Sequence, residues 1–421
     1  MVNKGYNLTR VDIEVDLPFE IVSNTTVLSI TMVENLLTPG LQTSVQLDSF
    51  FHNPDIKDYD IFKYKVMGIT ITTPGGDGAR EKEQVISGRI YRQSNRRLIN
   101  DNNEKFTLHL CDDSLLIDAV NMVSKSWKCE TPDAIVDEVL QECLGVDPDK
   151  IKIMPGTVAP ARDYIAQNIH PLQVINQQAT VAMDGDEPSF LHYMTYEDMD
   201  LDDPRGTHYF RSLKNMVEEA DYMLDPYIYA VAGEPNTYNK DQTILTYSFP
   251  CDFDILSDLL NGIDENGEDI TSIFVINPKI KAVSMLGNDV VGCGLGAGPV
   301  KTVLTNIVSA LDQDSCPTDV EHHMLLRQAR MSLLEQDKIA FRCTIPWNPD
   351  LHVGNKIKVI LPHKTYHQDM RGGTVGELYG SDTYLIVGLV HNILNGGYST
   401  TTLDCITKTA GARGFIDIGG G

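Results

Sequence analysis

The hydrophobic and polar positions alternate with period two over the first 110 residues of the chain. Apolar side chains alternate with polar ones at 11–15, at 45–47 and at 106–110. Alternation of this kind is typical of strands that bury one face. Proline and glycine interrupt the alternation at 38–40, where a turn is expected. The pattern predicts a partly closed antiparallel barrel or sandwich over residues 1–112.

A helical period follows directly. Apolar residues share one face of a predicted helix at 115–123, with Asp113 or Ser114 as its cap. A Thr-Pro pair at 131–132 supplies an N-cap and a first-turn proline for a second helix, and Gly145 is placed to end it. These signals predict that the region after the first β block is helical.

Mixed structure is predicted for the rest of the middle of the chain. Pro171 begins a further helix, and residues 190–196 and 208–211 have the composition of strands. Further on, residues 244–249 and 273–276 are expected to be strands. After them, Pro299 is expected to start an amphipathic helix that carries Val300, Val303 and Leu304 on one face.

The last hundred residues return to period two after one helix. Thr318 and Glu321 form a capping box that opens a helix predicted to end near Gln336. Four strands are then predicted, at 339–345, 357–361, 383–393 and 398–406. An Asn-Gly pair at 395–396 joins the last two, because Asn-Gly supplies the positive φ angles that tight hairpin turns need.

Length and charge narrow the class of protein. A chain of 421 residues is expected to form two to four domains. With 59 acidic against 34 basic residues, its net charge of −25 disfavours adhesive binding to nucleic acid. The charge has two open interpretations, which are simple solubility and a surface that lets a polyanion pass without sticking.

Targeting and redox signals are weak. No apolar run approaches the roughly 18 residues of a membrane helix, and residues 1–6 lack the apolar core of a signal peptide, so no membrane contact or secretion is expected. The eight cysteines are scattered singly, which predicts buried thiols made in a reducing compartment and not a disulfide framework.

A glycine run at 292–298 is the strongest candidate for a ligand site. Lys301 and Thr302 follow it, and glycines ahead of a helix can cradle a phosphate. A P-loop needs glycine, lysine and serine or threonine in succession, whereas Pro299 and Val300 separate the last glycine from the lysine. A flexible linker is favoured, and a cytoplasmic nucleotide- or cofactor-binding enzyme that uses the loop 292–302 is the alternative.

Candidate metal ligands are few. Acidic runs at 197–203 and 264–269 are predicted to be solvated turns, because neither has the spacing of a calcium loop. His363, His367 and Asp369 lie in a turn-rich segment that does not fix their spacing. No catalytic motif is present, so we expect neither catalytic residues nor a bound metal or cofactor.

Four passages resemble, in order, the baseplate hub protein of contractile-tailed bacteriophages, the family that also supplies the hub part of type VI secretion spike proteins. The passages are 106–116 with 131–136, 169–175 with 188–191, 348–354 with 357–361, and 384–391 with 399–404. They are similar, in turn, to the end of the first barrel, the middle domain, the entry to the second barrel and its closing hairpin. Order along the chain carries the resemblance more than any one motif.

The resemblance implies an α+β fold with two antiparallel β-barrel-like tube domains flanking a mixed α/β middle domain. The barrels would be residues 1–112 and a split pair, 240–275 with 318–408. The middle domain would be 113–239. Residues 276–317 have no clear counterpart and are expected to return to the middle domain, and 409–421 form a glycine-rich tail.

The resemblance also implies a function. The chain would be a non-enzymatic structural protein of the virion, assembled in the host cytoplasm into the tail baseplate. A homotrimer with six barrels would join a hexameric tail tube, or its initiator protein, to a trimeric spike, and would contact other baseplate proteins. DNA would pass through its channel without specific binding, along a bore lined by Asp, Glu and small polar residues. A hub of a phage-derived contractile injection system is the alternative within the same family.

The tail carries the remaining candidate site. Phe415, Ile416, Asp417 and Ile418 stand between glycines at the end of the sequence. Three apolar side chains at a chain end cannot bury themselves alone, so we expect this segment to dock on the spike or on a neighbouring subunit.

Overall fold

The computed structural model describes a set of segments that together hold most of the expected elements. The described residues are 8–17, 25–49, 61–73, 81–100, 103–154, 161–184, 189–201, 203–218, 226–229, 242–250, 272–277, 282–287, 300–304, 341–361 and 382–407. The helix expected between Thr318 and Gln336 lies outside them.

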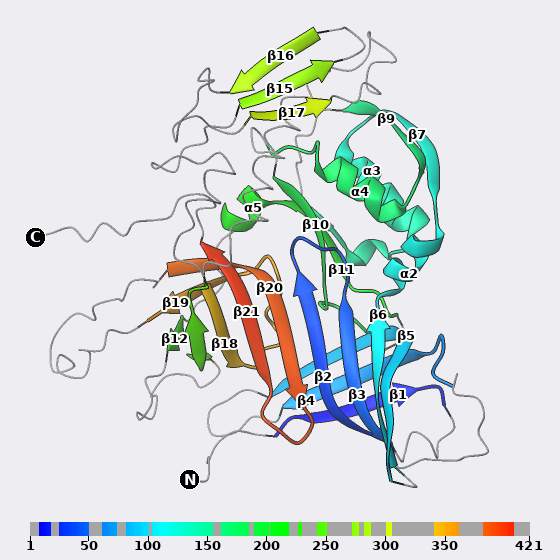
Figure 1. Ribbon diagram of the computed structural model, residues 1–421, viewed down its shortest axis with the longest axis vertical. Coiled ribbons are helices and arrows are strands. Elements are labelled where there is room, and N and C mark those ends of the chain that lie inside the picture. Colours follow the sequence, from blue (N-terminus) through cyan, green and yellow to red (C-terminus); the bar gives the residue numbers. More distant parts are fainter. Residues whose placement is uncertain are drawn as a thin grey trace, which may run out of the picture.

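A 13-stranded sheet dominates the fold (Figure 1). Its first half, which we call the N-terminal unit, has the strand order β1-β4-β5-β6-β3-β2. These strands are β1 (Arg10–Val15), β2 (Thr25–Asn35), β3 (Gln42–Ser49), β4 (Val66–Thr73), β5 (Lys82–Asn100) and β6 (Asn103–Cys111). Burial alternates along them, as along β3, because one face packs on the core and the other faces solvent.

The second half, the C-terminal unit, is built from segments far apart in the sequence. Its strands are β12 (Tyr227–Tyr229), β13 (Thr243–Ile244), β14 (Thr246–Ser248), β18 (Phe341–Pro346), β19 (Lys356–Ile360), β20 (Asp382–Leu394) and β21 (Thr400–Thr407). One branch runs from β20 through β19 and β12 to β13, and another runs through β21 and β18 to β14. The strands expected in the last hundred residues are thereby confirmed.

The two units share one backbone ladder. β2 pairs antiparallel with β20, from Ser29 opposite Leu394 to Asn35 opposite Gly388. Figure 1 shows the orange β20 lying directly beside the blue β2. Continuous hydrogen bonding across the boundary fixes the register of one unit on the other.

The β20–β21 hairpin tip lies between β1 and β2. Asn395 accepts a hydrogen bond from the Val11 amide at 3.3 Å and donates one to the Val27 carbonyl at 3.0 Å. Thr9 exchanges two backbone bonds with the same turn, and Gly396 adopts the positive φ of 68° that the Asn-Gly pair predicted. No β1–β2 ladder is present among the described strands, so the tip bridges the two.

We expect Asn395→Ala to lower the free energy of unfolding by about 1–3 kcal/mol, because it removes a donor and an acceptor from two backbone groups that the turn covers. Asn392→Ala is the matched control, since Asn392 is exposed and its one bond, to Thr31, is 3.5 Å long. The control should change stability by less than about 0.5 kcal/mol in urea unfolding. Equal effects of the two substitutions would contradict this role for Asn395.

The middle region packs helices and short sheets above the N-terminal unit (Figure 1). Its elements are α2 (Asp113–Val120), β7 (Val123–Glu130), α3 (Pro132–Glu138), a π-helical turn (Val139–Cys143), a 3-10 turn (Pro148–Lys150), β8 (Ile151–Ile153), β9 (Arg162–Ile169), α4 (Pro171–Ala179), β10 (Phe190–Thr195), β11 (Thr207–Ser212) and α5 (Leu213–Glu218). Pro132 and Pro171 each open a helix, and Gly145 has a φ of 68°, as expected.

Three expectations are corrected. The cap of α2 is Asp112, not Asp113 or Ser114, and Val123 begins a strand instead of ending that helix. Pro299 starts no helix, because Val300–Leu304 is strand β17, paired parallel with β15 (Ser272–Asn277) beside β16 (Ala282–Gly287). β-Branched residues fit either pattern, and pairing with β15 decides for the strand.

The fold is therefore mostly β with few helices, which confirms the α+β class. Three hydrophobic cores correspond to the N-terminal unit, the C-terminal unit and the middle region. The first core also contains Trp347 and Ile393 from the C-terminal unit and Met194 from the middle region, so the three parts are packed together.

Two expectations about chemistry meet the structure here. In the described part of the chain, no helix is both long and apolar enough to cross a bilayer. Cys129 is disulfide-bonded, which corrects the expectation that every cysteine is a free thiol, whereas Cys111, Cys143, Cys343 and Cys405 are free.

Candidate functional site: polar junctions between the units

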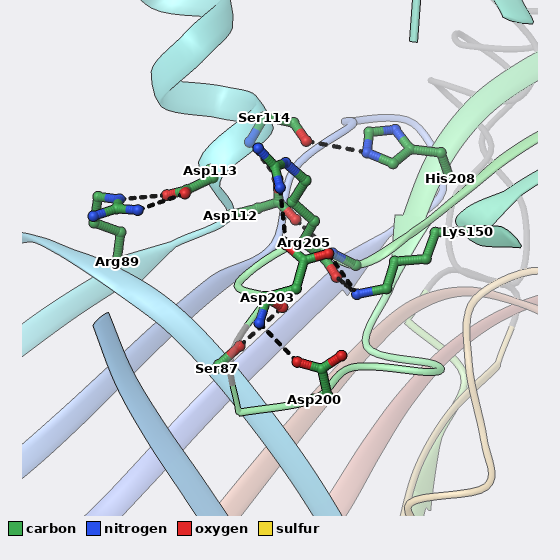
Figure 2. A network of polar contacts seen from close by, with 11 residues as sticks. Ser87, Arg89, Asp112, Asp113, Ser114, Lys150, Asp200, Asp203, Arg205 and His208 are labelled. Atoms are coloured by element: carbon green, nitrogen blue, oxygen red, sulfur yellow. Dashed lines mark hydrogen bonds and ion pairs between the residues drawn. The ribbon is translucent and has the colours of Figure 1, made fainter. Parts of the chain in front are cut away.

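Two buried polar junctions hold the parts of the molecule in fixed positions. The first joins the N-terminal unit to the middle region and is centred on Asp112, directly after β6 (Figure 2). One Asp112 oxygen accepts from the Ser114 amide at 2.6 Å and caps α2, and the other accepts from the Gly206 amide at 2.6 Å. Burial raises the pKa of Asp112 to about 6, although both amide bonds oppose the rise.

A bidentate ion pair ties α2 to the sheet. Arg89 on β5 donates to both carboxylate oxygens of Asp113, at 2.6 Å and 2.7 Å, and also to the Tyr64 carbonyl at 2.9 Å. Two parallel bonds fix the orientation of the guanidinium as well as its distance. Helix α2 therefore cannot rotate on β5 without breaking this pair.

The acidic run 197–203 is not simply a solvated turn, which corrects part of that expectation. Asp203 accepts from Lys150 and Arg205, each at 3.0 Å, while its own amide donates to Asp200. Its carbonyl accepts from Ser87 on β5 at 3.1 Å (Figure 2). The loop thus uses paired charges to dock the middle region on the N-terminal unit.

Two buried histidines continue this junction inward. The Nε2 atom of His192 lies 3.1 Å from Nδ1 of His208, whose Nε2 lies 3.3 Å from the Ser114 hydroxyl. Burial lowers the pKa of His192 to about 4. Burial, followed by the positive charges of His192, Arg205 and Lys150, lowers the pKa of His208 well below its usual value. Both rings are therefore neutral near pH 7, and one donates to the other.

The second junction joins all three parts of the molecule at Glu34. This side chain, on β2, is wholly buried and accepts from the amide of Tyr196 at 2.9 Å, after β10. It also accepts from the amide of Val353 at 3.0 Å and from Nδ1 of His352 at 2.9 Å, both in the loop before β19. Burial alone would lower the pKa of His352, but the charge of Glu34 and its hydrogen bond raise it overall.

The sequence pattern did not single out either junction. The one signal for Glu34 is its position, because it follows Val27, Ile30 and Met32 on the buried face of β2. A carboxylate at a core position of a strand needs buried partners. For Asp112 the signal was the start of a helix, and the cap was placed one residue too late.

Most ligand candidates from the sequence lie outside the described residues. They are the loop 292–302, the acidic run 264–269, the segment with His363, His367 and Asp369, and the docking candidates Phe415, Ile416, Asp417 and Ile418. Within the described segments, no group of three His, Cys, Asp or Glu side chains is placed to hold a metal ion.

Similarity to known proteins was found only among solved structures. No protein-family model and no curated protein matches the chain. The 43 kDa tail protein of prophage MuSo2 from Shewanella oneidensis matches with a TM-score of 0.55 and 8% identity, covering 96% of this chain and 99% of that protein. A tail protein from Neisseria meningitidis MC58 matches with a TM-score of 0.53 and 10% identity, covering 94% and 96%.

The chain has the fold of these phage-type tail proteins. The match extends over nearly the full length of each protein, so the order of all three parts is shared. The E. coli c3393 protein, a component of the type VI secretion system, matches with a TM-score of 0.49 and 11% identity over 94% of this chain. The resemblance drawn from the four sequence passages is confirmed at the level of fold.

Proposed function

We propose that this chain is a structural tail protein that forms the central hub of a baseplate. Three copies would join the tail tube or its initiator protein to the spike, contact other baseplate proteins and surround part of the channel through which DNA leaves. The shared fold along the whole chain supports a tail protein, and the joined β units support a ring-forming one. The protein would act in the virion after assembly in the host cytoplasm, with no catalytic residue.

The observation that carries the proposal is the strand run β5-β6-β3-β2-β20-β21-β18-β14, which crosses both units without a break. Among the described strands, β14 pairs only with β18, and the distal half of β5 pairs only with β6. The run therefore has one open edge in each unit. Different open edges at opposite ends favour head-to-tail contacts, which close into a ring.

The solvent-facing side of this run suits the wall of a DNA channel. A ladder of neutral polar side chains crosses five strands, formed by Asn392, Thr31, Ser44, His109 and Ser94. Its paired side chains include Ser44 and Ser94, whose hydroxyls lie 3.1 Å and 2.7 Å from the two ring nitrogens of His109. Such groups hydrate well and offer DNA no fixed charge.

Charges on this face occur in pairs. Lys105 lies 3.6 Å from Asp48, and Arg342 holds both oxygens of Asp404 at 2.5 Å and 3.0 Å. Paired cations gain little by displacing counterions from phosphates, so DNA would slide without binding. We therefore propose that this face lines the bore, with small polar residues prevailing over the acidic ones that the net charge led us to expect.

We expect the purified chain, alone or with its spike, to have the mass of a trimer and to appear in negative stain as a ring with a central channel. Mass photometry over a dilution series, followed by imaging of the same sample, tests this. A monomeric or dimeric mass within an assembled baseplate would contradict the proposal. A compact particle without a channel would favour the alternative, an enzyme that uses the loop 292–302.

A further inference from the structure

The distal half of β5 is a long open edge. β4 pairs with β5 only as far as Arg89, and the amide of Ile90 bonds to the Lys65 carbonyl. From Tyr91 to Ile99, β5 has β6 on one side and no partner on the other among the described strands. Unpaired strand edges attract other chains unless they are guarded.

The side chains at this edge have the composition of an interface. We call Tyr91, Arg92, Arg97, Leu98 and Ile99 the β5 strip. Its apolar members are 49%, 54% and 48% exposed, for Tyr91, Leu98 and Ile99 respectively. Arg92 and Arg97 are exposed and make no ion pair, in contrast to Arg96, which is bonded to Glu104. Tyrosine and arginine are enriched in protein interfaces, and unpaired arginines favour an acidic partner.

The backbone of this edge is guarded against a simple added strand. The β5–β6 register shifts between Ile90 and Arg92, again between Ser94 and Arg97, and again before Asn100. Asn95 also has a positive φ of 54°. These bulges prevent regular pairing along the edge, so an occupant must bind mainly through side chains. It must combine apolar residues with at least one carboxylate.

We propose that the β5 strip binds the segment 415–418 of a neighbouring copy of this chain. Phe415, Ile416 and Ile418 would cover the apolar members of the strip, and Asp417 would pair with Arg92 or Arg97. The inference rests on the proposed ring, because the ring supplies the neighbour.

The chain's own tail cannot reach the strip. β21 ends at Thr407, opposite Tyr384, whereas Leu98 lies opposite Glu104 at the far end of the same sheet. Counting rows through β20, β2, β3 and β6 places these ends about 40 Å apart along the strands, at roughly 3.3 Å per residue. The chain from Thr407 to Phe415 spans at most about 28 Å when fully extended.

A neighbour's tail is better placed. In a head-to-tail ring, the open edge that faces β5 belongs to the neighbour's β14, which is only three residues long. That strand cannot cover an edge running from Tyr91 to Ile99. The neighbour's tail leaves from β21, in the same unit as its β14, so it is the nearest segment able to cover the remainder.

Photo-crosslinking in the full-length chain tests the proposal. Leu98 is replaced by benzoylphenylalanine, the mass of the complex is measured, and the sample is irradiated and mapped by mass spectrometry. We expect crosslinks to residues 415–418, joining labelled to unlabelled chains when isotopically distinct copies are mixed before assembly. Val120, which is 79% exposed on α2, carries the same group in the control and should give no such product.

The double substitution Arg92→Ala and Arg97→Ala should reduce the crosslink yield at least tenfold. Arg10→Ala, which removes an exposed arginine on β1, should leave the yield unchanged. A trimer that gives no crosslink to the tail, or only crosslinks within one copy or to the spike, would overturn the inference while leaving the hub proposal intact. A monomer without crosslinks would instead overturn the hub proposal.

Discussion

Glu34→Ala should lower the free energy of unfolding by about 3–5 kcal/mol, the usual cost of leaving one member of a buried charge pair alone. The substitution strands a buried His352 and removes the acceptor of the Tyr196 and Val353 amides. All three parts of the molecule lose a shared anchor at once. Glu14→Ala is the matched control, because Glu14 is exposed on β1 and should cost less than about 0.5 kcal/mol.

Tryptophan fluorescence in a urea series measures this effect, because Trp347 is buried in the N-terminal core beside the junction. The pH dependence has a definite sign. The pKa of His352 is raised in the folded state, so the pair stabilises fully below the unfolded pKa of about 6.5, and its contribution is lost as pH rises through the raised pKa. Glu34→Gln should abolish this slope. Unchanged slope and unchanged stability in the variants would contradict the anchoring role.

The second large effect is a loss of stability in acid that starts at the histidine pair. The pKa of His192 is lowered to about 4, so the folded state resists a proton that the unfolded chain accepts below about pH 6.5. Its contribution is full above pH 6.5 and falls by about 3 kcal/mol as the pH approaches 4. His208 adds a loss of the same sign.

Asp112 acts against this loss over part of the range. Its pKa is raised to about 6, so protonation favours the folded state as the pH falls from 6 towards the unfolded value near 3.8. Two histidines oppose one carboxyl, with Arg205 and Lys150 adding positive charge nearby, so the net effect is destabilising. Trp127, buried in the core of the middle region, reports the transition.

The variant that carries His192→Gln and His208→Gln should lose less stability between pH 6.5 and 4.5 than the native chain. The same substitution at the exposed Lys152 serves as the control and should leave the slope unchanged. A double variant with the native slope would show that other groups govern acid unfolding.

Strands could be predicted wherever a sheet buries one face. The alternation at 106–110 and at 383–393 survives in β6 and β20 because each buried face demands apolar residues. The helices after Pro132 and Pro171 were predictable for a local reason, since proline fits the first turn. Pattern reasoning failed at Val300–Leu304, where pairing with β15 outweighs a helical spacing.

What joins distant parts left little mark in the sequence. Nothing in residues 25–35 names β20 as their partner, because backbone pairing is blind to side-chain identity. The same holds for Glu34, whose partners come from three separate segments. The domain boundaries and the docking of Phe415 to Ile418 remain predictions.

The β2–β20 ladder also constrains how the protein is made. Thr31 and its partner Asn392 lie 361 positions apart, so a ribosome adding 5–20 residues per second delivers the second about 20 to 70 s after the first. During that time the nascent N-terminal unit has one whole strand edge uncovered. A newborn chain of this kind depends on chaperones or on slow dilution to avoid sticking to its siblings, and premature stops beyond the first unit would yield aggregates instead of a usable half.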